Sequence, residues 1–422
     1  MTFTALHRAL GRAPGPLTND MIDEAVSIGL AESADLDWKS KLPPTAKLHD
    51  TDYPKDIAAM ANSGGGTIVY GVDEKQKAAS ARVDVGTLTE AHERTLRSVA
   101  GRAIMPAVLG LEIYSLDDGG SPPHAVVVVV PASIDGPHFI YKGDYFAAPF
   151  RNDADTAWMT ERQVEAMYRA RFNERRRAMQ AIDDLYRDMA AGRDSVGPYG
   201  RAWFIAVAHP RLPAVVGPRP SRDTAREAVE RAASFAHTYS GDTRGYRPLD
   251  SVDRDVPRPG LRRWIAPFKF KGDGYRGQET WAAIHNDGSV GLAAAVGGWS
   301  RPDTSKTNGA HLESQAIEVG VSALFGLIRA ASEHWVTSEY DAQIGIDWSH
   351  NSGRLVISTI DGHGVRFEGT STPLAHYTPV TTTVVADAAP DDFHGQLRDT
   401  ATDCINQGGI SNLTLIYDAP AP

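Results

Sequence analysis

Three acidic residues stand near the start of the chain at a spacing that could serve metal-dependent phosphate chemistry. Glu32 and Asp37 lie at the start of one apolar segment, and Asp73 follows the next, at the end of GTIVYGVD. Neighbouring elements can bring such residues to one edge of a sheet, where carboxylates repel one another unless their pKa values rise or a cation neutralises them. Mg²⁺ and Mn²⁺ prefer oxygen ligands of this kind and can polarise a scissile phosphate. The pattern therefore predicts an acidic metal-dependent nuclease site held by Glu32, Asp37 and Asp73.

The same residues also have a purely structural interpretation. Glu32 and Asp37 can flank a strand and satisfy backbone groups or Lys39, while Asp73 closes a turn. A site of this kind would leave the carboxylates too far apart to share an ion. Both interpretations stay open at the level of sequence.

The acidic residues need a strand, a helix, a glycine turn and a second strand to position them. Residues 36–42 alternate enough for a strand, and residues 53–62 carry apolar side chains at helical spacing. Ser63-Gly64-Gly65-Gly66 then closes the helix, because glycine tolerates positive φ and close backbone approach. The turn is either only a tight connection or a place where phosphate approaches the backbone. No Gly-Lys-Ser/Thr follows it, so the sequence contains no P-loop here.

This order of pieces resembles the Schlafen AlbA_2 domain, a family of nucleic-acid-associated modules. The residues that carry the resemblance are Glu32, Asp37-Trp38-Lys39, Ala61-Asn62, the three glycines and Gly71-Val72-Asp73. It continues weakly to about residue 170, through Arg151-Asn152 and Met159-Thr160. The resemblance implies that the catalytic acids of the family's nuclease branch map onto Glu32, Asp37 and Asp73, with Lys39 near the phosphate. In one departure, Asp37 stands where the family's nucleases have Glu, and the shorter side chain could lose or shift a metal.

The resemblance also implies partners. It favours nucleic acid, and RNA over DNA, with structured RNA such as tRNA as the substrate of a metal-dependent endoribonuclease. The alternative is a non-catalytic DNA- or RNA-binding regulator in transcription or phage defence, and a third is a protein-interaction scaffold. A homodimer is expected by analogy only.

Basic residues indicate where nucleic acid would bind. Residues 160–190 are predicted to form a long helix whose arginines alternate with glutamates, as on a solvated face or on a surface that contacts phosphate. A net charge of −10 argues against a protein coated in positive charge. The residues predicted to contact nucleic acid are Lys39, Lys41, Arg151, Arg162 and Arg169.

Length and composition set the architecture. A chain of 422 residues predicts two or three domains of a globular protein. We expect an α+β fold with a lead-in at residues 1–18 and an AlbA_2-like mixed sheet with flanking helices at residues 19–190. Glycine and proline interrupt the chain near residues 191–199, and residues 200–422 are predicted to form a second α+β domain of unrecognised type. The single cysteine, Cys404, excludes an intrachain disulfide and a cysteine-based zinc site.

The elements of both parts can be placed from apolar patterning. Residues 87–102 are predicted as a helix, and residues 108–116, 125–131 and 138–150 as strands, the five valines from 126 to 130 indicating a strand covered on both faces. The second part is predicted to hold helices at 221–239, 311–332 and 392–406, and strands at 202–208, 262–270, 279–285, 289–296, 341–348, 354–360, 378–386 and 413–417. The longest apolar run is too short for a bilayer and residues 1–15 lack a secretory signal, so no membrane contact and a cytoplasmic location are expected.

Overall fold

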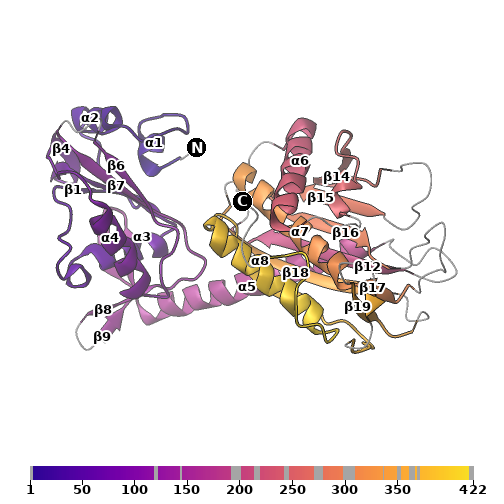
Figure 1. The fold of residues 1–422 in the computed structure, drawn as a ribbon. Coiled ribbons are helices and arrows are strands. Elements are labelled where there is room, and N and C mark those ends of the chain that lie inside the picture. Colours follow the sequence, from indigo (N-terminus) through magenta and orange to yellow (C-terminus); the bar gives the residue numbers. More distant parts are fainter. Residues whose placement is uncertain are drawn as a thin grey trace. The chain divides into compact units, whose positions relative to one another are not determined.

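A computed structural model describes residues 3–117, 122–142, 145–191, 201–212, 219–241, 247–269, 279–297, 309–335, 337–348, 353–360, 366–367 and 371–417. The chain divides into two compact units, Met1–Arg175 and Arg176–Pro422 (Figure 1). Both units combine helices with sheets, so the predicted α+β class is confirmed. Of the predicted boundary at 191–199, all but residue 191 lies outside the described residues.

The N-terminal unit is built on a mixed four-stranded sheet. Its strands follow the order β1-β2-β7-β6. Strands β1 (Leu36–Lys39) and β2 (Gly66–Tyr70) pair in parallel, because the helix α3 (Tyr53–Asn62) crosses over between them. Strand β7 (Ala125–Val130) pairs antiparallel with β2 on one side and with β6 (Glu112–Leu116) on the other. The predicted order of strand, helix, glycine turn and strand is confirmed.

Helices cover both faces of this sheet. On β7, Val126, Val128 and Val130 pack with α3 and α4 (Glu90–Arg102), whereas Val127 packs with α1 (Ala5–Ala9) and α2 (Asn19–Ser27). Successive side chains of a strand point to opposite faces, so a strand covered on both faces can be apolar throughout. The prediction for the five valines is confirmed.

Residues 1–18 were predicted to form a loose lead-in, and the structure places part of them in the core. Helix α1 has a side-chain cap from Thr4, and Leu6 is fully buried. Because Leu6 and Leu17 belong to the same apolar cluster as α2, the described part of the lead-in packs against the sheet.

Short hairpins complete the N-terminal unit. Strands β3 (Val72–Lys75) and β4 (Ala78–Arg82) are joined through Gln76 and Lys77, both at positive φ. Strands β10 (Pro149–Asn152) and β11 (Asp155–Trp158) form a second hairpin. The remaining strands, β5 (Ile104–Met105), β8 (Phe139–Lys142) and β9 (Tyr145–Ala147), form a three-stranded sheet in the order β5-β8-β9. Helix α5 (Glu161–Ala190) follows as one long helix, as predicted.

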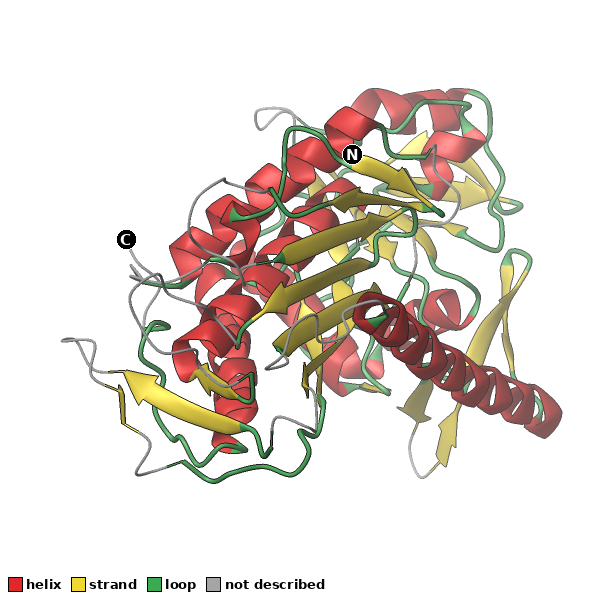
Figure 2. Cartoon of the chain, turned by 90° about the vertical axis from the view of Figure 1, so that its right-hand side faces the viewer, coloured by secondary structure: helices red, strands yellow, loops and turns green. Residues whose placement is uncertain are grey.

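The C-terminal unit is built on a seven-stranded antiparallel sheet in the order β13-β14-β15-β16-β12-β18-β21. Its strands are β12 (Ala202–Pro210), β13 (Arg258–Gly260), β14 (Arg263–Ala266), β15 (Thr280–His285), β16 (Val290–Ala295), β18 (Glu339–Trp348) and β21 (Val380–Val385). Figure 2 shows strands in yellow with helices in red beside them. One face packs on α6 (Arg222–Tyr239), α7 (Ser314–Trp335) and α8 (Pro390–Asn406). Trp203, Ile205 and Val207 of β12 face the other side and pack against the last turns of α5.

Two predicted elements of this unit differ from the structure. The predicted helix at 311–332 begins as a strand, β17 (His311–Glu313), which pairs with β19 (Val356–Ile360), and β19 pairs in turn with β20 (Arg366–Phe367). Residues 413–417 form no strand. The backbone N–H groups of Thr414, Leu415 and Ile416 donate instead to the buried carboxylate of Glu318 on α7.

Candidate nucleic-acid site

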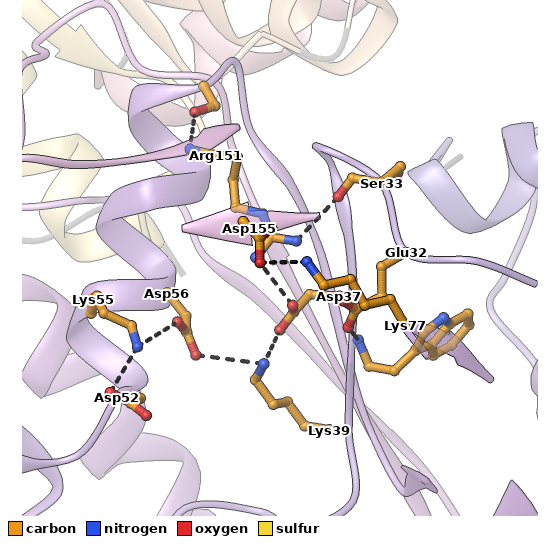
Figure 3. A network of polar contacts seen from close by, with 12 residues as sticks. Glu32, Ser33, Asp37, Lys39, Asp52, Lys55, Asp56, Lys77, Arg151 and Asp155 are labelled. Carbon is orange, nitrogen blue, oxygen red and sulfur yellow. Dashed lines mark hydrogen bonds and ion pairs between the residues drawn. The ribbon is translucent and has the colours of Figure 1, made fainter. Parts of the chain in front are cut away.

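Strand β1 decides which side chains meet at the candidate site. Leu36 and Trp38 point into the cluster beneath α1 and α2, so the alternation of the strand turns Asp37 and Lys39 toward α3. The arrangement is visible in Figure 3, where Asp37, Lys39 and the α3 residue Asp56 lie together. The sheet alone therefore brings an acid and a lysine predicted from the sequence to the same place.

Asp37 is buried and lies between two cations. The residue is 2% exposed, its Oδ1 lies 3.1 Å from Nη1 of Arg151, and its Oδ2 lies 2.5 Å from Nζ of Lys39. A buried carboxylate needs such partners, because an unpaired charge in the interior is costly. Both oxygens of Asp37 therefore already face positive charge.

Arg151 was predicted to contact nucleic acid, and the structure places it inside the unit. Pairing of β10 with β11 carries it to the end of α3, where its N–H donates to Ser63 Oγ at 2.8 Å. Its Nη2 donates to the carbonyl of Ser33 at 3.2 Å, and the residue is 7% exposed. Arg151 thus holds the start of β1 against the glycine turn and offers little surface to a phosphate.

Asp56 is a second buried acid at the site, and the sequence analysis did not single it out. It lies 3.9 Å from Nζ of Lys39 and 3.8 Å from Nζ of Lys55. Burial raises the pKa of Asp56 to about 6, although Lys39 opposes that shift. For Lys39, burial alone would lower the pKa, but the carboxylates of Asp37 and Asp56 outweigh it, so the pKa is raised and the ammonium stays charged. The sequence pattern that could have identified Asp56 is an acid directly beside the apolar positions of the amphipathic helix at residues 53–62.

Glu32 lies just before β1, beside the β3–β4 hairpin. Its N–H donates to the carbonyl of Lys77, and its Oε1 accepts the N–H of Trp38 at 3.0 Å. Burial is the main cause that raises the pKa of Glu32 to about 7, and the nearby charge of Asp37 and a hydrogen bond with Glu74 add to it. With its pKa near 7, Glu32 gains or loses its charge close to neutral pH.

The third predicted acid, Asp73, is on the exposed β3 strand. An irregularity in the hairpin register falls between Asp73 and Glu74, and of these two acids it is Glu74 that hydrogen-bonds with Glu32. In the described part of the chain, no group of three His, Cys, Asp or Glu side chains is placed to hold a metal ion. As they are placed, Glu32, Asp37 and Asp73 therefore do not fit Mg²⁺ or Mn²⁺ as a shared set of ligands.

The glycine turn and Asn62 before it have structural roles at this site. A Cβ on Gly65 would lie 2.7 Å from the backbone N of Ala132, and one on Gly66 would lie 2.3 Å from Sδ of Met60. Asn62 donates to the carbonyls of His138 and Pro149 and accepts the N–H of His138. These contacts explain the Ala-Asn-glycine pattern through packing.

The other predicted basic residues lie on the surface. Lys41 is exposed just after β1, while Arg162 and Arg169 are exposed on α5, where Arg169 pairs with Glu165 at 2.5 Å. Lys39, with 36% of its side chain exposed, is the cation that reaches the surface from between buried Asp37 and Asp56. No described helix is long and apolar enough to cross a membrane.

Part of the N-terminal unit matches a known protein family. Residues 32–157 match the family described as Schlafen, AlbA_2. A solved structure, the DIP2311 protein from Corynebacterium diphtheriae, has 16% sequence identity and a TM-score of 0.25 over 35% of this chain and 28% of that one. No curated protein matches. The matched residues include Glu32, Asp37, Lys39, Asp73 and the glycine turn, so this chain contains a Schlafen AlbA_2 domain, whose family suggests a nucleic-acid-related function.

Proposed function

We propose that the AlbA_2 domain binds nucleic acid where β1 ends, with Lys39 and Lys41 contacting the phosphate backbone. The observation that carries this proposal is the Lys39 side chain, which is 36% exposed and whose Nζ lies 2.5 Å from Oδ2 of buried Asp37. A lysine acts on phosphate as a compact point charge, and contacts of this kind supply most of the affinity for nucleic acid. Structured RNA such as tRNA is the first substrate to test, because the family resemblance favours it.

Carboxyl groups beside Lys39 give this site a dependence on pH. The pKa of Glu32 is about 7 and that of Asp56 about 6, so both lose negative charge as the pH falls from 8 toward 6. Less negative charge near Lys39 means less repulsion of phosphate. The affinity for RNA is therefore expected to increase as the pH falls through neutral.

Fluorescence anisotropy with a labelled tRNA transcript tests the proposal. We expect Lys39→Met and Lys41→Met each to weaken binding and to reduce the slope of log affinity against log salt by about 1, as loss of one phosphate contact requires. Lys269→Met is the matched control, because Lys269 is similarly exposed and lies in the other unit. Wild-type protein that binds no RNA, or equal effects of Lys39→Met and Lys269→Met, would reject the site.

A second candidate is an endonuclease, and the hydrogen-bonded pair of Glu32 and Glu74 favours it. A carboxyl group with a pKa near 7 next to a lysine can accept or donate a proton at a phosphate, and perturbed acids concentrate at active sites. Mg²⁺ or Mn²⁺ stays part of this candidate as a prediction. Because Asp37 is already neutralised by Lys39 and Arg151, a divalent ion would have to compete with those cations.

Cleavage of total tRNA and of single-stranded DNA, with Mn²⁺ and with a chelator, tests this candidate. Loss of cutting in Glu32→Gln, Glu74→Gln or Asp73→Asn with RNA binding retained would identify which acids act in the reaction. Wild-type protein that binds RNA without cutting it in either condition would leave a binding protein and reject the nuclease.

A further inference from the structure

The N-terminal unit carries a run of contacting aromatic rings that faces solvent. The ring centroids of Tyr141 and Phe146 lie 6.1 Å apart, those of Phe146 and Phe139 5.1 Å, those of Phe139 and Tyr168 6.4 Å, and those of Tyr168 and Phe172 6.2 Å. We call these five residues the aromatic strip. Four of the rings are well exposed, from 36% at Tyr168 to 63% at Tyr141. A contiguous apolar patch of this kind on a soluble protein usually marks an interaction surface.

The strip runs from the β8–β9 hairpin onto the first half of α5, which Figure 1 shows side by side. At 3.6 residues per turn, Glu161, Glu165, Tyr168, Phe172 and Arg175 lie along one side of this helix. The order along that side is acidic, aromatic and basic. Half of each charged side chain stays exposed at Glu165 (48%) and Arg175 (50%), although Glu165 pairs with Arg169 and Arg175 with Asp135.

We propose that this side of α5 pairs with the same side of α5 in a second copy of the chain, antiparallel and around a twofold axis. In such an interface each contact occurs twice, because the same surface is used by both copies. Placing Tyr168 opposite the partner's Phe172 sets Glu165 opposite the partner's Arg175, since both pairs of numbers share one midpoint. The acidic end of this side of α5 in each copy then meets the basic end of the same side in the other copy.

The charges favour a second copy over nucleic acid as the occupant. Glu161 and Glu165 stand on the same side as the rings and would repel a phosphate backbone. In the antiparallel pair these acids complement arginine. The rings themselves suit either occupant, so the order of the charges decides between them.

The exposed surface of the rings determines the expected affinity of the dimer. Aromatic residues bury roughly 150 to 250 Å² each when fully covered, so the exposed fractions of the strip correspond to about 400 Å² per copy. Two copies together with their charged flanks approach the lower end of specific interfaces, roughly 1,200 Å². The dimer is therefore expected to dissociate in the micromolar range, on the order of 10 μM.

Sedimentation velocity of the full chain from roughly 1 to 100 μM tests the proposal. We expect a monomer–dimer equilibrium for the wild type and a monomer for Phe172→Ser. Because the ring of Phe172 is exposed, its removal should leave the core intact. Glu165→Arg and Arg175→Glu should each weaken the dimer roughly ten-fold, because each places like charges opposite one another twice. An equal mixture of these two variants should recover the wild-type affinity, since each then meets the opposite charge. Glu90→Arg on exposed α4 is the control and should leave the dimer unchanged.

Several results would overturn the proposal. These are a wild type that is monomeric at the highest concentration, a Phe172→Ser variant that dimerises as the wild type does, and a mixture of charge variants that gains no dimer. Loss of RNA binding in Phe172→Ser with no change in mass would assign the strip to nucleic acid instead. The proposal does not depend on Lys39, so RNA binding can fail while the dimer persists.

Discussion

Asp37 and Arg151 show how a residue that the sequence marks for chemistry can first serve the fold. The sequence identified both, but it could not show that β10–β11 pairing brings Arg151 from far along the chain to within 3.1 Å of Asp37. Asp56 and Glu74 were not predicted as site residues. Their roles depend on which face of α3 meets the sheet and on the irregular register of β3 with β4, and neither is encoded in local spacing.

Removing one partner of the buried pair tests its structural role. Arg151→Met leaves Asp37 paired with Lys39 alone among the described cations, and we expect it to lower the free energy of unfolding by roughly 3 kcal/mol, as for other broken buried ion pairs. The double variant Asp37→Asn with Arg151→Met should recover part of that loss, because no buried charge is then left unpaired. Denaturant titration measures both, and equal stability of Arg151→Met and wild type would contradict the assigned role.

The raised pKa of Glu32 predicts how stability depends on pH. A carboxyl group whose pKa rises on folding from 4.5 to about 7 favours the folded state in its protonated form. Its contribution is fully present below pH 4.5 and is lost as the pH rises through 7. Glu32→Gln should therefore be more stable than wild type at pH 8, by about 1 kcal/mol after allowance for solvent screening, and close to it at pH 5. Thermal unfolding at the two pH values checks this, and a stability difference that does not change with pH would contradict it.

At the scale of elements, apolar periodicity predicted most helices and strands, because these elements bury their apolar faces between the layers of each unit. The β3–β4 hairpin was missed because Gln76 and Lys77 occupy positive φ without the Asn, Asp or Gly that usually marks such a turn. The strand predicted at 413–417 is absent because its N–H groups bind Glu318, a long-range contact that a local pattern does not contain.

Helix packing in the C-terminal unit gives a matched pair of glycine substitutions. A Cβ on Gly326 of α7 would lie 2.3 Å from the carbonyl oxygen of Ala232 on α6, whereas nothing lies within 4 Å of a Cβ on Gly395 of α8. Gly326→Ala should destabilise the unit by roughly 2 kcal/mol through this overpacking. Gly395→Ala should stabilise it by about 0.5 to 1 kcal/mol, because alanine favours the helix. Thermal unfolding of both variants decides, and a stabilising Gly326→Ala would contradict the close crossing of α6 and α7.

For the whole molecule, length and the glycine and proline break predicted two parts, and the family match covers only residues in the first. The net charge of −10 makes general attraction to nucleic acid weak, so the proposed binding relies on local cations such as Lys39. The function of the seven-stranded unit could not be predicted, because its apolar patterning specifies layers and no motif specifies chemistry.

The pH dependence of RNA binding tests the central claim most directly. Fluorescence anisotropy would measure the Kd of a labelled tRNA transcript at pH 6 and pH 8, at one ionic strength, for wild type and Glu32→Gln. We predict that wild type binds roughly five-fold more tightly at pH 6, and that Glu32→Gln shows a smaller pH dependence, because Asp56 is then the remaining acid near Lys39 whose charge changes in this range. Equal pH dependence in the two proteins, or tighter binding at pH 8, would contradict the account.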